Sequence, residues 1–134
     1  ENIGTLWRSA WQLGAAGIFT IGRKQRKQTS DVLNVPQKIP YRHFDSFEDF
    51  LISRPVGTQL IGVEFGGIPL SKFSHPAKAI YLLGSETNGL SNEILAACNA
   101  IVEIESINYM SYNVSVAGSI VMYHRLISSI GSSD

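Results

Sequence analysis

The stretch AIYLLGSETNGLS, residues 79–91, decides the fold class of this chain. Its first five residues form an unbroken apolar run, which is typical of a parallel strand buried on both faces. Gly84 and Gly89 then permit close backbone turns, and Ser91 is a suitable N-cap for a helix predicted over residues 92–99. The stretch is therefore a strand, a loop and a helix, which is the repeating unit of an α/β fold.

The same alternation extends along the rest of the chain. Apolar periodicity and turn residues predict helices over residues 3–13, 47–52 and 114–130, and strands over residues 18–21, 41–44, 59–63 and 100–104. Gly66 and Gly67 are predicted to form a turn after the third of these strands. We therefore predict the α/β class, with a mostly parallel sheet flanked by helices. Ligands bind at the carboxyl ends of strands in such sheets, so loops 84–91 and 105–112 are the candidate binding loops.

The composition is that of a folded globular protein, and the length of 134 residues predicts a single domain. No apolar run is long enough to cross a bilayer, and the Cys and His residues do not cluster at metal-ligand spacing. We therefore expect neither a membrane partner nor a metal. The single cysteine, Cys98, excludes an internal disulfide and fits a reducing compartment, which favours a cytoplasmic protein.

Basic residues concentrate in one predicted loop, although the formal net charge is zero. Four positive charges fall within five residues, at Arg23, Lys24, Arg26 and Lys27. Such a loop is either a solvated surface segment or a patch that binds phosphate groups.

The start of the last predicted helix is unusual in its small residues. Ser111 and Asn113 stand just before it, where polar side chains satisfy the free backbone N–H groups of a helix. Ser115, Ala117 and Gly118 follow at once, and small side chains let another backbone or a ligand come close. The segment is either a tightly packed helix start or half of a binding site.

Three segments, taken in order, resemble the motifs of a known family. They are residues 2–10 (NIGTLWRSA), 83–91 (LGSETNGLS) and 111–117 (SYNVSVA). In order and spacing they resemble the three motifs of the SpoU (TrmH-like) RNA ribose methyltransferases of the SPOUT superfamily. The matching positions of the first motif are Asn2, Gly4, Arg8 and Ala10. Each motif is moderately specific, and the ordered set is highly specific.

The resemblance implies a fold and a cofactor. In that family the carboxyl-terminal part of the chain forms a deep trefoil knot, which general folding rules make improbable, so the knot rests on resemblance alone. The family binds S-adenosylmethionine within the knot. By motif position the resemblance places these residues at the cofactor: Leu83, Gly84, Ile104, Met110, Ser111 and Tyr112, with Glu64 at the edge of the pocket.

The implied reaction is methyl transfer to a ribose 2′-hydroxyl of tRNA or rRNA. An alcohol is a poor nucleophile, so a positioned group must help to remove its proton. The resemblance gives the chief catalytic role to Arg8, which orients the phosphate and ribose or assists deprotonation. Asn2, Glu86, Ser111 and Asn113 form its polar surroundings. The residues expected to contact RNA are Arg8, Arg23, Lys24, Arg26 and Lys27.

The resemblance also implies a homodimer, with active sites near the interface. The apolar faces of the first and last helices are the candidate contact surfaces. The family has a strand before its first motif, whereas this sequence starts at Glu1. We therefore expect residues 1–134 to form a single methyltransferase domain that lacks its native amino-terminal strand or extension.

Two other interpretations remain open. The family's third motif usually begins Ile-Pro-Met, whereas Ile104 is followed here by Glu105, and Tyr112 stands where Leu is usual. These departures motivate a catalytically weak or inactive family member that binds RNA or a cofactor without turnover. A flavodoxin-like or other nucleotide-binding α/β domain explains the alternation of strands and helices, but not the three motifs.

Overall fold

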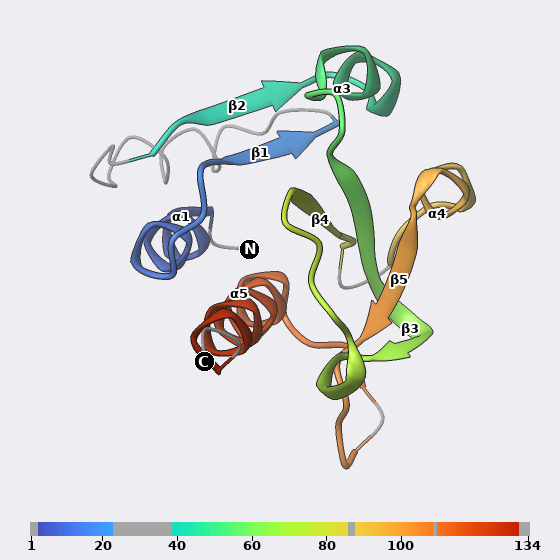
Figure 1. The fold of residues 1–134 in the computed structure, drawn as a ribbon. Helices are drawn as coiled ribbons and strands as arrows, with labels where there is room; N and C mark the ends of the chain where they lie inside the picture. The colour runs from blue at the N-terminus through green and yellow to red at the C-terminus, as the bar shows by residue number, and fades with distance from the viewer. Residues whose placement is uncertain (1–2, 23–38, 86–87, 109, 132–134) are drawn as a thin grey trace. The chain divides into compact units, whose positions relative to one another are not determined.

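The structure is a computed structural model that describes residues 3–22, 39–85, 88–108 and 110–131. Its contacts divide the chain into two compact units, Glu1–Pro55 and Val56–Asp134. Each unit has its own parallel sheet, in which the described strands number two in the first unit and three in the second (Figure 1). The parallel strands and flanking helices confirm the predicted α/β class.

The first unit contains, in order, α1 (Ile3–Gln12), β1 (Ile18–Ile21), β2 (Tyr41–Phe44) and α3 (Phe47–Ser53). The predicted helix and strand positions are confirmed to within one residue at nearly every end. Helix α1 buries Ile3, Trp7 and Ala10, which lie on one face because they recur at helical spacing. The indole N–H of Trp7 donates to the carbonyl of Ile39 at 2.9 Å, which ties α1 to the segment that leads into β2.

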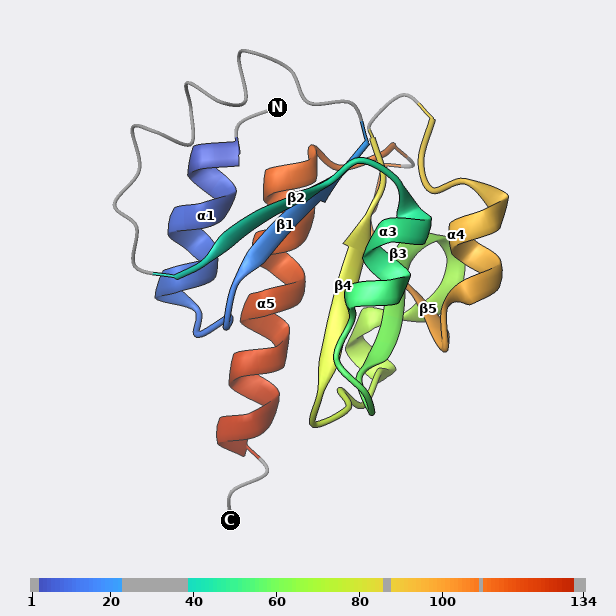
Figure 2. The ribbon, with the colours of Figure 1, turned by 90° about the horizontal axis from the view of Figure 1, so that it is seen from above.

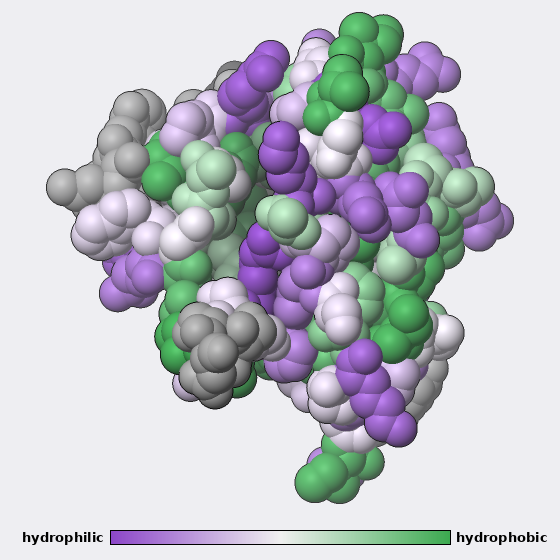
Figure 3. All heavy atoms as spheres, viewed as in Figure 1, coloured by the Kyte–Doolittle hydropathy of each residue, from purple (hydrophilic) through white to green (hydrophobic). Residues whose placement is uncertain are grey.

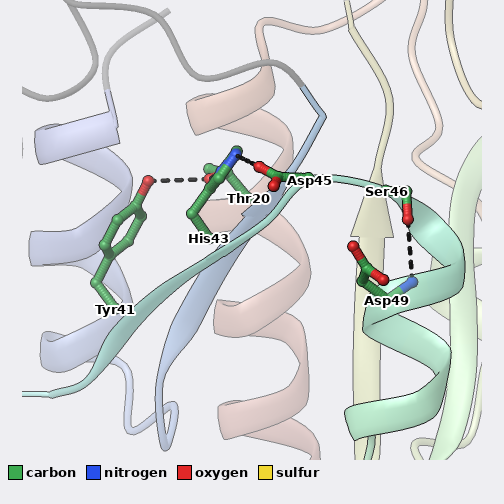
Figure 4. A network of polar contacts seen from close by, with 6 residues as sticks. All are labelled: Thr20, Tyr41, His43, Asp45, Ser46 and Asp49. Atoms are coloured by element: carbon green, nitrogen blue, oxygen red, sulfur yellow. Dashed lines mark hydrogen bonds and ion pairs between the residues drawn. The ribbon is translucent and has the colours of Figure 1, made fainter.

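Figure 4 shows polar contacts between β1 and β2, and a separate hydrogen bond at the start of α3. The hydroxyl of Thr20 lies 2.9 Å from the hydroxyl of Tyr41 and 2.7 Å from Nδ1 of His43. The Ser46 hydroxyl accepts the backbone N–H of Asp49 at 3.1 Å and so caps α3. The first two bonds join β1 to β2, and the third stabilises the start of α3.

The second unit carries the larger sheet. Its elements are β3 (Gln59–Pro69), the 3₁₀ helix η1 (Leu70–Lys72), β4 (Ala79–Leu83), α4 (Asn92–Ala97), β5 (Ala100–Glu103) and α5 (Val114–Gly131). The strand order is β4-β3-β5, and both pairs are parallel. Alternate side chains point to opposite faces of these strands. Ile61 and Val102 therefore pack with Val121 of α5, while Gly62 lies against Cys98, at the end of α4.

Seen from above, α5 and α4 lie on opposite sides of this sheet (Figure 2). Helix α4 ends at Ala97, two residues before its predicted end, and Cys98 is its C-cap. The Cys98 thiol is partly buried, donates to the Ile94 carbonyl at 3.3 Å, and has a pKa raised by this burial. Arg125 of α5 anchors that helix by donating to the carbonyls of Pro76 and Ala77 at 2.7 and 2.9 Å.

The prediction that Gly66 and Gly67 form a turn after the strand is wrong, because β3 continues through both residues to Pro69. The pairing of β3 with β5 shifts between Val63 and Ile68 instead. Gly66 has a φ of +90°, and a Cβ on Gly67 would lie 2.5 Å from the carbonyl oxygen of Ile101. The two glycines therefore bend the strand against its neighbour rather than terminate it.

Among the described residues, none of the helices combines the length and the apolar character that a membrane crossing requires.

Candidate functional site

A pocket lies in the second unit, beside the carboxyl ends of β4 and β5. Its lining includes six residues that the sequence placed at a cofactor: Glu64, Leu83, Gly84, Ile104, Ser111 and Tyr112. They come from segments far apart in sequence, which the parallel sheet brings to one edge. The location follows the general rule for ligand sites in parallel sheets.

The loop after β4 forms one wall of this pocket and turns tightly back on itself. The backbone N–H of Gly89 donates to the Ser85 carbonyl at 2.9 Å, and the N–H of Asn88 donates to the Ser85 hydroxyl at 3.1 Å. A Cβ on Gly84 would lie 2.3 Å from the carbonyl carbon of Gly89. Only glycine fits at position 84, because the two ends of the loop are in direct backbone contact.

Two carboxylates from neighbouring strands line the same pocket. Oε1 of Glu64 accepts the backbone N–H of Leu90 at 2.9 Å, and Oε1 of Glu103 accepts the N–H of Gly66 at 2.9 Å. Both oxygens therefore have backbone partners. Among the described residues, no group of three or more His, Cys, Asp or Glu side chains is arranged to hold a metal ion.

The segment after β5 contributes Tyr112 to the pocket, and hydrogen bonds at Glu105 hold the start of the segment in place. The Tyr112 hydroxyl donates to the Glu105 carbonyl at 2.8 Å. The hydroxyl and backbone N–H of Ser71 both donate to the Glu105 carboxylate, and these bonds, the hydroxyl's foremost, lower the pKa of Glu105. Glu105 and Tyr112, which depart from the family's third motif, thus each have hydrogen-bond partners within the protein.

Met110 differs from the other expected cofactor residues. Its side chain is 74% exposed, and it does not belong to the described pocket lining. Ile107 of the same segment is fully exposed. Figure 3 shows a hydrophobic projection at the bottom of the molecule, where Figure 1 places the loop between β5 and α5. The segment therefore presents apolar side chains to solvent and Tyr112 to the pocket.

Asn113 caps helix α5 directly beside the pocket. Its side-chain oxygen accepts the backbone N–H groups of Ser115 at 2.9 Å and Val116 at 3.3 Å. Val114 and Ala117, in the first turn of α5, belong to the lining. The segment is therefore a capped helix start that also forms a pocket wall, and its part in a binding site stays a prediction.

The remaining predicted residues lie elsewhere. Arg8 belongs to α1 in the first unit, and its side chain is exposed. Asn2, Glu86 and the basic residues Arg23, Lys24, Arg26 and Lys27 lie outside the described residues.

Several lining residues were missed by the sequence prediction. They are Val63, Phe65, Ser85, Gly89, Glu103, Val114 and Ala117. The register offers a signal that would have found some of them, because Val63 pairs with both Leu83 and Val102 at one edge of the sheet. Applying the strand-end rule also to the strand predicted over residues 59–63 would have selected Phe65.

Comparisons with known proteins agree on one family. The profile of the SpoU rRNA Methylase family matches residues 1–123. A protein of Archaeoglobus fulgidus described as an uncharacterized tRNA/rRNA methyltransferase is 26% identical over 129 residues, which cover 92% of this chain and 58% of that protein.

Solved structures show the same fold. The SpoU methyltransferase AviRb from Streptomyces viridochromogenes, in complex with AdoMet, superposes with a TM-score of 0.82 at 24% identity, over 98% of this chain and 56% of that one. A structure concerned with the 2-OH methylation of C/U34 on tRNA has a TM-score of 0.83 at 25% identity, over 97% of this chain and 89% of that one. The chain thus spans little more than half the length of the archaeal relative and of AviRb. Because the family profile covers nearly the whole sequence, the chain belongs to the SpoU rRNA Methylase family.

Proposed function

We propose that this protein is an S-adenosylmethionine-dependent methyltransferase that methylates a ribose 2′-hydroxyl of tRNA or rRNA. The observation that carries the proposal is the pocket in which residues of the second and third motifs meet, at Gly84, Ser111 and Tyr112. Family membership supports it, as do AviRb, whose structure contains AdoMet, and the related structure concerned with tRNA 2-OH methylation.

The pocket suits the proposed cofactor in shape and charge. Leu83, Gly84 and Ile104 line it, and a Cβ at position 84 has no room because the backbone of Gly89 lies against it, so the loop that forms this wall is compact. The carboxylate of Glu103 adds negative charge to the lining, which complements a sulfonium cation. When bound, S-adenosylmethionine supplies an electrophilic methyl group.

The chain's own residues must orient the RNA and assist removal of the hydroxyl proton. We assign the chief role to Arg8, whose exposed guanidinium is suited to hold a phosphate by two parallel hydrogen bonds. An arginine is a poor base, so we expect Arg8 to act mainly by alignment, which supplies much of the rate enhancement in bimolecular reactions. Asn2, Glu86, Ser111 and Asn113 complete the proposed polar surroundings, and Arg23, Lys24, Arg26 and Lys27 the proposed RNA contacts.

We further propose that both units form one domain with a carboxyl-terminal trefoil knot, which acts as a homodimer in the cytoplasm. The family profile supports a single domain, because it runs through both units. The apolar stripe on α5 supports the dimer, since Val116, Tyr123, Ile127 and Ile130 recur at helical spacing and are 42–62% exposed.

The proposal is tested first by calorimetry. The folded protein should bind S-adenosylmethionine and its demethylated product, and absence of binding to either would refute the enzymatic function. Mapping of 2′-O-methyl groups in RNA from cells with and without the protein then identifies the substrate, and loss of a methylated position is the expected result.

A second candidate function is binding without turnover. It is favoured by the segment after β5, where Glu105 replaces the usual proline and Ile107 and Met110 are exposed. Retained cofactor binding, with no methyl transfer to any cellular RNA pool, would decide for this candidate.

A further inference from the structure

Among the described residues, a side chain of the sheet holds the pocket wall formed by the loop after β4. The bonds of Ser85 to Asn88 and Gly89 close the loop on itself but are internal to it. The tie to the sheet comes from Glu64 on β3, whose Oε1 accepts the backbone N–H of Leu90 at 2.9 Å. A charged acceptor makes this bond roughly twice as strong as one between neutral groups.

The fit between Glu64 and the loop is close. Gly89 has a φ of +67°, and a Cβ there would lie 2.7 Å from the same Oε1 atom. The other carboxylate oxygen, Oε2, accepts the N–H of Phe65 at 3.2 Å. Both oxygens of Glu64 are thus engaged by backbone donors, one of them across 26 residues of sequence. A carboxylate bound in this way is placed to fix backbone rather than to follow a ligand.

We propose that Glu64 is a positioning residue, which clips the loop after β4 into the shape that the cofactor requires and acts through the N–H of Leu90. This inference rests on the proposed function. The clipped loop contributes Gly84, Ser85 and Gly89 to the pocket wall. Release of the loop therefore moves that wall, and small displacements of a binding wall are costly to affinity and rate.

The test separates this role from direct contact of the Glu64 charge with the cofactor. Glu64→Gln keeps a side-chain oxygen for the Leu90 N–H but removes the charge. Glu64→Ala removes the acceptor, and Glu64→Asp keeps the charge but withdraws it from the loop. The matched control is Glu103→Ala, because Glu103 lines the same pocket and bonds to Gly66 instead of the loop.

Two measurements are made on each variant. Hydrogen exchange of the Leu90 amide, in the protein without cofactor, measures whether the bond to Glu64 holds the loop. Calorimetry with S-adenosylmethionine measures the affinity of the pocket for the cofactor. We expect Glu64→Ala and Glu64→Asp to exchange faster at Leu90 and to bind about tenfold more weakly, and Glu64→Gln to stay within about threefold of the wild type in affinity. Glu103→Ala should leave Leu90 exchange unchanged.

Different results would overturn the inference in different ways. Affinity in Glu64→Gln as low as in Glu64→Ala means that the charge itself contacts the cofactor. If the Leu90 amide exchanges at the wild-type rate in folded Glu64→Asp and Glu64→Ala, the bond from Leu90 to Glu64 does not hold the loop. If the wild type binds no S-adenosylmethionine, the proposed function fails by that result, and the exchange data alone still decide whether Glu64 holds the loop.

Discussion

Nε2 of His75 lies 2.7 Å from Nδ1 of His124, across the boundary between the loop before β4 and helix α5. Arg125 donates to the Tyr81 hydroxyl at 3.0 Å, and the same hydroxyl lies 2.7 Å from Nδ1 of His75. Both ring nitrogens of His75 thus lie within hydrogen-bond distance of a neighbouring polar atom, and which of each pair donates depends on the tautomers of the two histidines.

The first prediction concerns the pH dependence of stability. Burial, followed by the positive charges of His124 and Arg125, lowers the pKa of His75 from 6.5 to about 4. The unfolded chain then binds a proton that the folded chain rejects, so stability is complete above pH 6.5 and falls as the pH drops toward 4. Because His75 is only partly buried, we expect the loss to be about 1 kcal/mol.

Urea unfolding between pH 4 and 7 measures this effect. His75→Gln should be less stable than the wild type at pH 7, and its free energy of unfolding should fall less steeply toward pH 4. Equal slopes for the two proteins would contradict the assignment of the titration to His75.

The second prediction concerns Arg8. Arg8→Ala should lower the rate of methyl transfer by more than about 100-fold, because the proposed alignment of phosphate and ribose is lost. The affinity for S-adenosylmethionine should hardly change, since the described pocket lining comes from residues 63–117. Single-turnover transfer and calorimetry measure the two quantities.

Two variants serve as controls for Arg8. Arg8→Lys keeps the charge without the planar fork and should remain strongly impaired. Arg54→Ala removes another exposed arginine of the same unit and should transfer methyl groups normally. Equal loss in Arg8→Ala and Arg54→Ala would point to a general electrostatic effect instead.

Local features of this fold were predictable from sequence because their causes are local. The apolar run of β4 predicts a buried strand, and Ser46 and Ser91 each stand before a helix and cap it. The start of α5 at Val114 follows from the polar cap of Asn113 and the apolar periodicity behind it. Such signals need only a few neighbouring residues.

Contacts that join distant segments were not predictable in the same way. Glu64 meets Leu90 across 26 residues, and His75 meets His124 across 49, so neither pair has a signature in local spacing. The family motifs led to part of the lining, such as Gly84, Ser111 and Tyr112. Glu103, which no motif marks, was missed because its position follows from strand register.

The third prediction uses the neighbouring glycines that bend β3. Gly66→Ala should cost about 1 kcal/mol, because its φ of +90° is strained for any residue with a Cβ and the space around it is open. Gly67→Ala should cost about 2 kcal/mol or more, since its Cβ would collide with the backbone of Ile101. Urea unfolding of both variants ranks the two losses of stability. If Gly67→Ala were as stable as Gly66→Ala, the bend in β3 would be readily displaced.

The fourth prediction separates two roles of Asn113. Asn113→Ala removes the acceptor for the N–H groups of Ser115 and Val116 and should destabilise the protein by about 1 kcal/mol. Asn113→Ser restores a capping oxygen and should recover most of that stability. If Asn113 also belongs to the polar surroundings of the reaction, Asn113→Ser will still transfer methyl groups slowly, because its shorter side chain caps the helix but lacks the amide N–H₂ donor.

Thermal unfolding and single-turnover transfer, measured on both Asn113 variants, distinguish these roles. Ser91→Ala is the control, since it removes the cap of α4, whose described residues do not line the pocket. It should lose stability while methyl transfer at low temperature stays normal. Full recovery of both stability and transfer in Asn113→Ser would reduce Asn113 to a helix cap, and would leave Arg8 as the principal proposed catalytic side chain.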